Sequence, residues 1–313
     1  MFKGKSVLVT GGTGSFGNFI VPELLKRGVE EVVVFSRDEE KQLDMRRRIT
    51  DERLRFVIGD VRDSQCVLEN LNVDTVYHAA ALKVIPTCEG FPVENLKTNV
   101  LGTLNVKLAC QKNGVKKALF LSTDKAVKPV NSYGMAKALA EKIWLNNYAD
   151  STTLFSAVRY GNVIGSRGSV VPFFKDLIAE KKPLLITHPK MTRFLITLKQ
   201  AVNLVFYATE HMVGGEIFVP DIPATDIITL AHAMTNSADY PMKTVGIRSG
   251  EKIHECLISE EEYPRAESVD KSIYVVHPYG SYKNSMMNGE FTSANARQLS
   301  IDETRSLLKE AGF

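Results

Sequence analysis

The sequence predicts an α/β protein in which a doubly wound parallel sheet occupies the first 160 residues and a smaller mixed α/β lobe occupies residues 161–313, with some segments returning to the first domain. Three observations lead to this prediction. Short apolar strands alternate with helical segments, a glycine-rich turn joins the first strand to the first helix, and the alternation stops beyond Tyr160. Such alternation favours parallel strands with right-handed crossovers and helices on both faces.

The composition is that of an ordinary soluble globular protein. Of 313 residues, 44% are hydrophobic and 24% are charged, and the formal net charge is +3. This charge gives no reason to expect nucleic acid or an anionic membrane surface as a partner. No apolar run reaches the ~18 residues of a membrane span and no targeting segment is visible, so we expect a cytoplasmic protein. We expect free thiols and no metal site from the four cysteines, because they lack metal-ligand spacing: Cys66, Cys88, Cys110 and Cys256.

The first strand, residues 6–10, runs into a glycine-rich turn and then a helix that ends near Gly28. Gly11, Gly14 and Gly17 let the backbone turn tightly and approach a pyrophosphate, which would lie at the N-terminus of the helix. Their G-x-x-G-x-x-G spacing differs from the G-x-G-x-x-G of most dehydrogenases. The order of strand, glycine turn and helix nevertheless predicts a dinucleotide site of the Rossmann type.

The second strand, residues 32–35, ends where the adenosine ribose should be read. An acidic residue there would favour a free 2′-hydroxyl, whereas Ser36 and Arg37 offer a hydroxyl and a guanidinium that suit a 2′-phosphate. We therefore expect NADP rather than NAD, with Lys41 as a possible aid to Arg37. Asp38 is expected to begin the next helix, because an acidic side chain suits the helix dipole there.

The next strands, at residues 55–58, 75–78 and 118–121, place further candidates at the carboxyl edge of the sheet. An aspartate after the third strand suits adenine contacts, and three alanines after the fourth let a bulky ring pass close to the backbone. His78 is expected to be a packed strand residue. The cofactor candidates of this region, including one in a long helix predicted at residues 92–113, are Asp60, Val61, Ala79, Ala80, Ala81 and Asn99.

The richest cluster of reactive side chains follows the fifth strand. Tyr133 and Lys137 are four apart in a predicted helix, residues 133–148, and therefore share one face. The ammonium beside the phenol favours the phenolate, which can act as a general base. Asp124 and Lys125 add a possible acid and a second base.

The second lobe begins with a glycine-rich loop, residues 161–169. Arg193 and Arg248 could converge on a diphosphate through forked hydrogen bonds, although either alone could be a surface residue. The other elements expected in this lobe are helices at residues 170–181, 198–211 and 301–311, a helix starting near Thr225, a strand at residues 216–219 and a polar loop at residues 279–295.

Several motifs, in order along the chain, resemble the extended short-chain dehydrogenase/reductases. They are Thr10-Gly11-Gly12-Thr13-Gly14-Ser15-Phe16-Gly17, Ser36-Arg37-Asp38-Glu39, Gly59-Asp60-Val61-Arg62-Asp63, Ser122-Thr123-Asp124-Lys125-Ala126, Tyr133-x-x-x-Lys137 and Arg159-Tyr160-Gly161-Asn162-Val163. Within that family, the segments at residues 165–174, 191–194 and 214–220 look like the UDP-N-acetylglucosamine 4,6-dehydratases, especially the C5-inverting type that opens pseudaminic-acid pathways. The resemblance covers roughly residues 3–258.

The resemblance implies conversion of UDP-N-acetylglucosamine to a UDP-4-keto-6-deoxy sugar of the L-arabino configuration, with NADP as a recycled hydride carrier. Tyr133, supported by Lys137, would take the proton of the 4-hydroxyl, and Thr123 would hold the resulting oxygen. Lys125 would remove the C5 hydrogen while Asp124 protonates the departing 6-hydroxyl. The ligand contacts implied are Gly11, Thr13, Gly14, Ser15, Phe16 and Gly17 for the cofactor and Lys83, Asn162, Val170, Arg193, Arg248 and Glu251 for the UDP-sugar.

Two positions depart from the family pattern: Val84 stands where histidine is usual, and Leu195 where an aromatic residue is usual. They keep open an enzyme that forms or converts a 5,6-unsaturated UDP-sugar, or a C5 epimerase. A non-catalytic NADP-sensing protein is an alternative from a second class. The helices at residues 92–113 and 133–148 carry more apolar side chains than one sheet face needs, which predicts a homo-oligomer.

Overall fold

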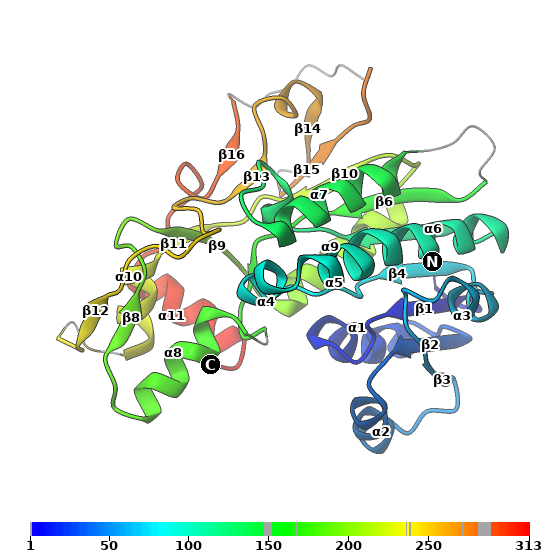
Figure 1. Ribbon diagram of the computed structural model, residues 1–313, viewed down its shortest axis with the longest axis horizontal. Helices are drawn as coiled ribbons and strands as arrows, with labels where there is room; N and C mark the ends of the chain where they lie inside the picture. The colour runs from blue at the N-terminus through cyan, green and yellow to red at the C-terminus, as the bar shows by residue number, and fades with distance from the viewer. Residues whose placement is uncertain are drawn as a thin grey trace. The chain divides into compact units, whose positions relative to one another are not determined.

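The structure is a computed structural model that describes residues 2–146, 152–166, 168–235, 237, 239–270, 272–280 and 289–313. It contains two compact units, each assembled from three segments of the chain (Figure 1). The predicted end of the helix at Tyr148, Arg167 of the glycine-rich loop and residues 281–288 of the polar loop expected at 279–295 lie outside the described residues. Unit 1 consists of Met1–Ser122, Ser132–Val158 and Val202–Phe218, and unit 2 of Thr123–Asn131, Arg159–Ala201 and Val219–Phe313.

Unit 1 is built on a parallel sheet, so the predicted fold class is confirmed. Its strands lie in the order β10-β6-β5-β4-β1-β2-β3, and every neighbouring pair is parallel. The sequence analysis missed β6, which lies between β5 and β10. The strands are β1 (Ser6–Thr10), β2 (Glu31–Ser36), β3 (Leu54–Ile58), β4 (Thr75–His78), β5 (Lys117–Leu121), β6 (Leu154–Val158) and β10 (Ile217–Pro220).

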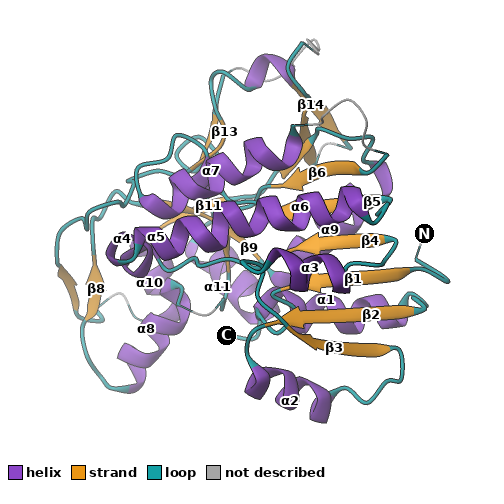
Figure 2. Ribbon diagram, turned by 45° about the vertical axis from the view of Figure 1, so that its right-hand side comes forward, coloured by secondary structure: helices purple, strands orange, loops and turns teal. Residues whose placement is uncertain are grey.

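Helices cover both faces of this sheet, and Figure 2 shows α3, α6 and α7 in front of the strands. The helix predicted at residues 92–113 is continuous, but its middle, Leu96–Leu101, is π-helical. Such segments interrupt α-helices often at functional sites. The helices are α1 (Ser15–Lys26), α2 (Glu39–Arg48), α3 (Ser64–Asn70), α4 (Ile85–Gly90), α5 (Pro92–Asn95), α6 (Gly102–Lys112), α7 (Ser132–Leu145) and α9 (Leu198–His211), which begins in unit 2.

The period-two alternation of β4 explains how the sheet holds helices on both sides. The Tyr77 hydroxyl is 3.0 Å from the hydroxyl of Thr209 on α9, and His78 points the other way, with Nε2 3.0 Å from the hydroxyl of Thr103 on α6. The His78 ring also stacks on Trp144 of α7. His78 is fully buried, and burial lowers its pKa to about 3. The prediction that it is a packed strand residue is confirmed.

Unit 2 combines short strands with helices around its own apolar cluster, which includes Phe174, Ile186, Met191, Leu230 and Leu308. Strands β11, β9 and β7 form one small sheet, β8 pairs with β12, β13 with β16, and β14 with β15. The elements are β7 (Asn162–Val163), α8 (Val170–Ala179), β8 (Leu184–Ile186), β9 (Thr192–Ile196), β11 (Ala224–Asp226), α10 (Ile227–Thr235), β12 (Met242–Thr244), β13 (Cys256–Ile258), β14 (Ala266–Val269), β15 (Ile273–Val276), β16 (Phe291–Thr292) and α11 (Ile301–Glu310), with 3-10 turns at Asp124–Ala126 and Tyr263–Arg265.

Side-chain caps decide where two helices of unit 2 begin. The Asp226 carboxylate accepts hydrogen bonds from the amides of Ile228 and Thr229, at 2.9 and 2.8 Å, so α10 starts directly after Asp226, in agreement with the start expected near Thr225. Ser300 and Glu303 form a capping box at the start of α11, where the sequence placed it.

All four cysteines are free, as predicted. Among the described residues, no helix combines the length and apolar character needed to cross a bilayer. The same residues contain no group of three or more His, Cys, Asp or Glu side chains placed to hold a metal ion.

Candidate active site

The glycine-rich turn of unit 1 has glycine where side chains would collide. A Cβ at Gly11, whose φ is +66°, would lie 2.9 Å from the Cα of Ala80, and one at Gly17 would lie 2.0 Å from the carbonyl oxygen of Gly12. Gly14 caps α1 without a side-chain hydrogen bond. The first-turn amides of a helix lack partners within the helix, so this turn fits the pyrophosphate of a dinucleotide.

Asn99 organises the backbone beside this turn. From the π-helical segment, its side-chain Oδ1 accepts from the amide of Leu82 and its Nδ2 donates to the carbonyl of Leu82, both at 2.8 Å. The Thr10 hydroxyl accepts from the amides of Ala79 and Ala80, at 3.1 and 3.2 Å. These bonds hold the alanine segment close to Gly11, so Asn99 acts on its position, and a direct contact with the cofactor stays a prediction.

The residues predicted to contact the adenosine ribose already have partners within the protein. The Ser36 hydroxyl is buried and accepts from Gln42 at 3.0 Å. Arg37 is half exposed and forms an ion pair with Asp60 at 3.6 Å. Burial alone would raise the pKa of Asp60, but Arg62 and Arg37 outweigh it and lower that pKa. Arg37 is therefore the ribose candidate whose charge is both exposed and oriented.

The other two cofactor candidates of this region, Lys41 and Val61, have contacts within the fold. Asp38 caps α2, as predicted, by accepting from the amide of Lys41 at 3.0 Å, and its carboxylate also pairs with the Lys41 ammonium. Val61 is buried beneath Gly102, where a Cβ would lie 2.7 Å from the Val61 side chain.

Tyr133 and Lys137 lie one turn apart on α7 and are both buried. The Lys137 ammonium donates to the carbonyl oxygen of Leu121 at 2.7 Å and lies 3.7 Å from the centre of the Phe120 ring. Burial lowers the pKa of Lys137 to about 7, although Glu141 acts in the opposite direction. A lysine that titrates near neutrality can change its charge at little cost during proton transfer.

In unit 2, Thr123 caps a short 3-10 turn that contains Asp124 and Lys125. The Thr123 hydroxyl donates to Asp124 Oδ1 at 2.9 Å and accepts from the amide of Lys125 at 3.3 Å. The Lys125 ammonium lies 3.1 Å from Asp124 Oδ1 and 3.5 Å from Asn162 Oδ1. The predicted acid and base are therefore in direct contact, with a predicted substrate residue beside them.

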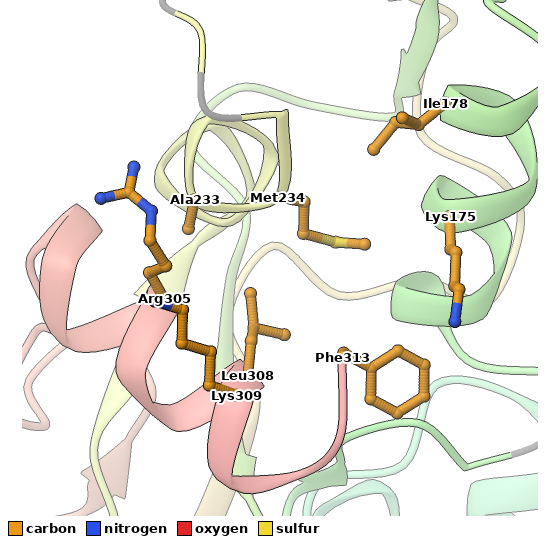
Figure 3. A pocket seen from close by; sticks show the side chains of 8 residues that line it. All are labelled: Lys175, Ile178, Ala233, Met234, Arg305, Leu308, Lys309 and Phe313. Carbon is orange, nitrogen blue, oxygen red and sulfur yellow. The ribbon is translucent and has the colours of Figure 1, made fainter.

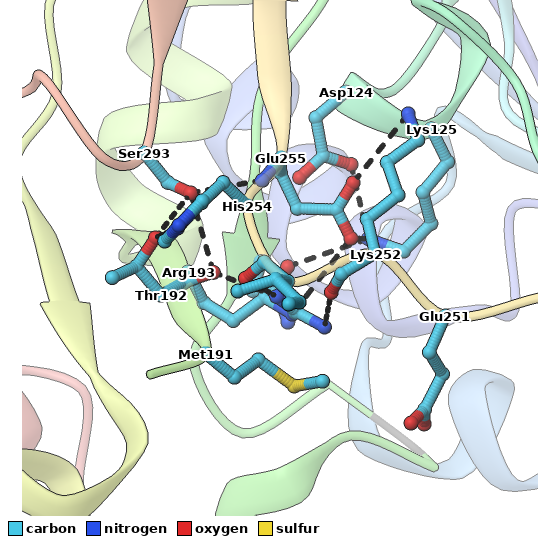
Figure 4. A network of polar contacts seen from close by, with 12 residues as sticks. Asp124, Lys125, Met191, Thr192, Arg193, Glu251, Lys252, His254, Glu255 and Ser293 are labelled. Carbon is cyan, nitrogen blue, oxygen red and sulfur yellow. Dashed lines mark hydrogen bonds and ion pairs between the residues drawn. The ribbon is translucent and has the colours of Figure 1, made fainter. Parts of the chain in front are cut away.

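Glu255 completes this group and was missed by the sequence analysis. Its carboxylate is 3.4 Å from the Lys125 ammonium, 3.7 Å from the Arg193 guanidinium and 3.9 Å from the Lys252 ammonium (Figure 4). A signal was present, because Glu255 directly precedes the apolar run of β13, where a carboxylate is expected to be buried and paired.

Burial and charge set the protonation of this cluster. Burial raises the pKa of Asp124; Lys125 opposes this rise and Glu255 adds to it. Burial alone would lower the pKa of Lys125, but Asp124 and Glu255 outweigh it and raise that pKa. Burial alone would raise the pKa of Glu255, but Lys125, Arg193 and Lys252 outweigh it and lower that pKa. Glu255 is thus the ionised carboxylate, and Asp124 is the one suited to hold a proton.

The two arginines predicted to converge on a diphosphate have different surroundings. The Arg193 guanidinium donates to the carbonyls of Thr192, Ile253 and Lys252, at 2.7, 3.1 and 2.9 Å. Arg248 is more than half exposed, and its guanidinium lies 3.9 Å from Glu251. Arg193 therefore holds the segment that carries Glu255, whereas the Arg248 guanidinium is exposed beside the partly buried Glu251. The diphosphate contacts of both arginines stay predictions.

Of the remaining positions named from the resemblance, two are exposed and two belong to the apolar cluster of unit 2. Lys83 is exposed, and so is Val84 at the start of α4. Val170 packs against the apolar cluster of unit 2, and Leu195 is buried within it.

Comparison with known proteins places this chain among nucleotide-sugar enzymes of the predicted fold. A family described as "Polysaccharide biosynthesis protein" matches residues 7–278. A protein named UDP-glucose 4-epimerase from Rickettsia rickettsii is 43% identical over 329 aligned residues, with 98% of this chain and 96% of the relative covered. The X-ray structure of Pen from Bacillus thuringiensis is 34% identical, with a TM-score of 0.92 over 99% of both chains.

A more distant structure shows the same fold. DesIV from Streptomyces venezuelae, a dTDP-glucose 4,6-dehydratase solved with NAD bound, is 20% identical and has a TM-score of 0.73, with 79% of this chain and 86% of DesIV covered.

The lowered pKa of Lys137 predicts a pH dependence of stability. Its folded pKa is about 7 and its ordinary value is 10.5, so between these values the unfolded chain binds more protons than the folded chain. The contribution of this group to stability therefore rises as the pH rises through that window. We expect the free energy of unfolding by urea to rise less steeply with pH in Lys137→Met than in the wild type. Lys142→Met, at an exposed position of the same helix, is the control, and an unchanged slope in Lys137→Met would contradict the assignment.

Proposed function

Since the chain belongs to the polysaccharide biosynthesis family of extended short-chain dehydrogenase/reductases, we propose that it is a 4,6-dehydratase of UDP-N-acetylglucosamine that inverts C5. The observation that carries this proposal is the contact, at 3.1 Å, between the partly buried Lys125 and the fully buried Asp124. Elimination of water needs an acid and a base beside each other in opposite protonation states. A simple 4-epimerase needs neither of them.

Each residue has one step in the proposed reaction. Tyr133, with Lys137 beside it on α7, takes the proton of the sugar 4-hydroxyl, and Thr123 donates a hydrogen bond to the resulting oxygen. When bound, the NADP supplies a reversible acceptor for the C4 hydride. The C5 hydrogen of the 4-ketone is acidic, so Lys125 removes it as a proton while Asp124 protonates the departing 6-hydroxyl, and water leaves. The hydride would return from the bound cofactor to C6. A solvent proton added to the opposite face of C5 gives the L-sugar, and the proton taken by Tyr133 passes to solvent.

The geometry of the pair supports the return to the starting state. The raised pKa of Asp124 suits a proton donor, whereas the raised pKa of Lys125 means that a proton must leave this lysine before it acts as a base. After elimination, Lys125 holds one proton more and Asp124 one fewer. Because the two groups are in hydrogen-bond contact, the proton can pass back from Lys125 to Asp124.

NADP is the cofactor that the surface around β2 favours. Arg37 is half exposed and forms an ion pair with Asp60. Its exposed guanidinium can therefore accept a 2′-phosphate as a further partner.

The names of the relatives indicate other candidate reactions. The proteins 42–43% identical are named UDP-glucose 4-epimerase, so 4-epimerisation of a UDP-sugar is the second candidate. The exposed Val84, where related dehydratases have histidine, keeps the conversion of a 5,6-unsaturated sugar or C5 epimerisation as a third.

The proposed reaction predicts the loss of one water from UDP-N-acetylglucosamine. Purified protein with NADP should give this product in a mass-spectrometric assay, faster than with NAD. Asp124→Asn and Lys125→Ala should each slow dehydration by about 10²–10⁴-fold, because they remove the acid or the base, while NADP binding is retained. Lys128→Ala, at an exposed lysine three residues along, is the control.

Other outcomes of this assay would identify the alternatives. An isomer of unchanged mass would indicate an epimerase, and turnover of only a 5,6-unsaturated substrate would indicate the third candidate. NADP binding without turnover of any UDP-sugar would indicate an NADP-sensing protein. Full dehydration by Asp124→Asn or Lys125→Ala would contradict the assigned roles.

We further propose that the protein is a homo-oligomer. The helices from α4 to α7 leave large apolar side chains exposed, and such a patch marks an interaction surface. Those on this part of unit 1 are Phe91, Val93, Leu96, Leu101, Leu108, Met135 and Leu139.

Light scattering should therefore give at least twice the mass of the 34.8 kDa chain. Met135→Glu combined with Leu139→Glu should shift the protein toward monomer, because buried carboxylates would oppose association. Val213→Glu changes an apolar side chain that is 76% exposed elsewhere and should leave the mass unchanged. A wild-type monomer at micromolar concentration would refute this proposal.

A further inference from the structure

The proposed chemistry leaves one buried carboxylate without a task. Elimination uses one acid and one base, which Asp124 and Lys125 supply, yet Glu255 is equally buried and ion-pairs with the same lysine. A buried carboxylate is costly unless it is paired. Glu255 has three cationic partners within 4 Å: Lys125, Arg193 and Lys252.

The backbone around Glu255 is fixed from several sides. Its amide donates to the Ser293 hydroxyl at 2.9 Å, and that hydroxyl lies 2.7 Å from the hydroxyl of Thr192. Arg193 donates to the carbonyls of Lys252 and Ile253, which lie three and two positions before Glu255. The carboxylate is thus held at its place beside Lys125 by bonds that do not involve Lys125.

Asp124 and Glu255 each have one buried carboxyl oxygen that lacks a hydrogen bond within the described part of the chain, although buried polar atoms are usually hydrogen-bonded. Asp124 Oδ2 and Glu255 Oε2 are both buried without a hydrogen-bond partner among the described residues. Two such oxygens on two ionised carboxylates would be unfavourable, and a proton on one of them relieves this. Glu255 has more cationic neighbours than Asp124, so it is the one that remains charged.

We propose that Glu255 is a positioning residue whose carboxylate holds Lys125 beside Asp124 and stabilises the ammonium that forms when Lys125 takes the C5 proton. This inference rests on the proposed function, in which Lys125 is the base. Charge develops on Lys125 only as the proton is transferred. A fixed anion 3.4 Å away therefore stabilises the transition state more than the ground state in which Lys125 is neutral.

The direction of the effect of Glu255 on Lys125 follows from its charge. A negative group beside an ammonium makes its proton harder to remove, and the same group makes the proton of Asp124 harder to remove. The other charged groups that face Glu255, Arg193 and Lys252, are positive and have the opposite effect. Removal of the Glu255 charge should therefore move both limbs of the pH profile to lower pH.

The test is Glu255→Gln, which keeps the size of the side chain and removes its charge. The pH profile of the dehydration rate should move down by about 1–3 pH units, and its maximum should fall, because the developing ammonium loses its partner. Glu255→Asp keeps the charge and should keep the profile close to that of the wild type, with a lower maximum. Glu262→Gln is the matched control: Glu262 is also a buried glutamate of unit 2, but it pairs with Arg159, so the variant should lose stability without moving the profile.

A second measurement does not depend on turnover. Lysine labelled with ¹³C at Cε and ¹⁵N at Nζ reports the titration of each ammonium by NMR, and Lys125→Arg identifies the signal of Lys125. In Glu255→Gln this signal should titrate at lower pH than in the wild type. An unchanged or higher titration would overturn the inference, whether or not the protein dehydrates a UDP-sugar. If no UDP-sugar is dehydrated but the titration moves as expected, the proposed function fails and the control of Lys125 by Glu255 stands.

Discussion

The proposed chemistry depends on the contact between Lys125 and Asp124 in unit 2, where the two side chains are 3.1 Å apart and Asp124 is fully buried. Charges out of water are costly unless well paired, so a cluster of this kind is weak evidence for stability alone. Here the charges are not matched one to one, because Lys125 is shared between Asp124 and Glu255. An unequal sharing of protons between two acids is what a reaction with an acid step and a base step can use.

Unit 1 contributes a second constraint, which is close approach of backbone segments. Gly11 leaves the space that the backbone of Ala80 occupies, and Gly17 lets α1 begin against the turn at Gly12. Asn99 and Thr10 then fix the alanine segment by hydrogen bonds. The result is a tight turn between β1 and the N-terminus of α1, a form of site that suits a dinucleotide phosphate. The chain passes from this unit to the other between Ser122 and Thr123, just beyond β5.

Much of the fold could be predicted because it has local causes. The strand, turn and helix at residues 6–26 are visible in alternating chemistry and glycine spacing, and α7 is visible in the spacing of Tyr133 and Lys137. The exact start of α10 depends on a single side chain, the Asp226 cap, so the sequence located it only approximately. The strand β6 was missed because it lies between two helical regions.

The candidate site was harder to predict because its contacts are long-range. Glu255 meets Lys125 from 130 positions away, and no local pattern reports such a pair. The contacts of Arg193 could not be predicted for the same reason. The sequence suggested this arginine for a diphosphate, and in the structure its guanidinium also donates to the backbone before Glu255. Ser36 was selected from its position after a strand, and only the structure shows that its hydroxyl accepts from Gln42.

The central claim is that Lys125 removes the proton at C5 of a UDP-sugar. Proton NMR of the product formed in deuterated water tests it most directly, because C5 can gain deuterium only if a base has removed its hydrogen. The account predicts a 4-keto-6-deoxy product that carries deuterium at C5 and has the inverted configuration there. A product that keeps its hydrogen at C5, such as a C4 epimer of the substrate, would contradict it.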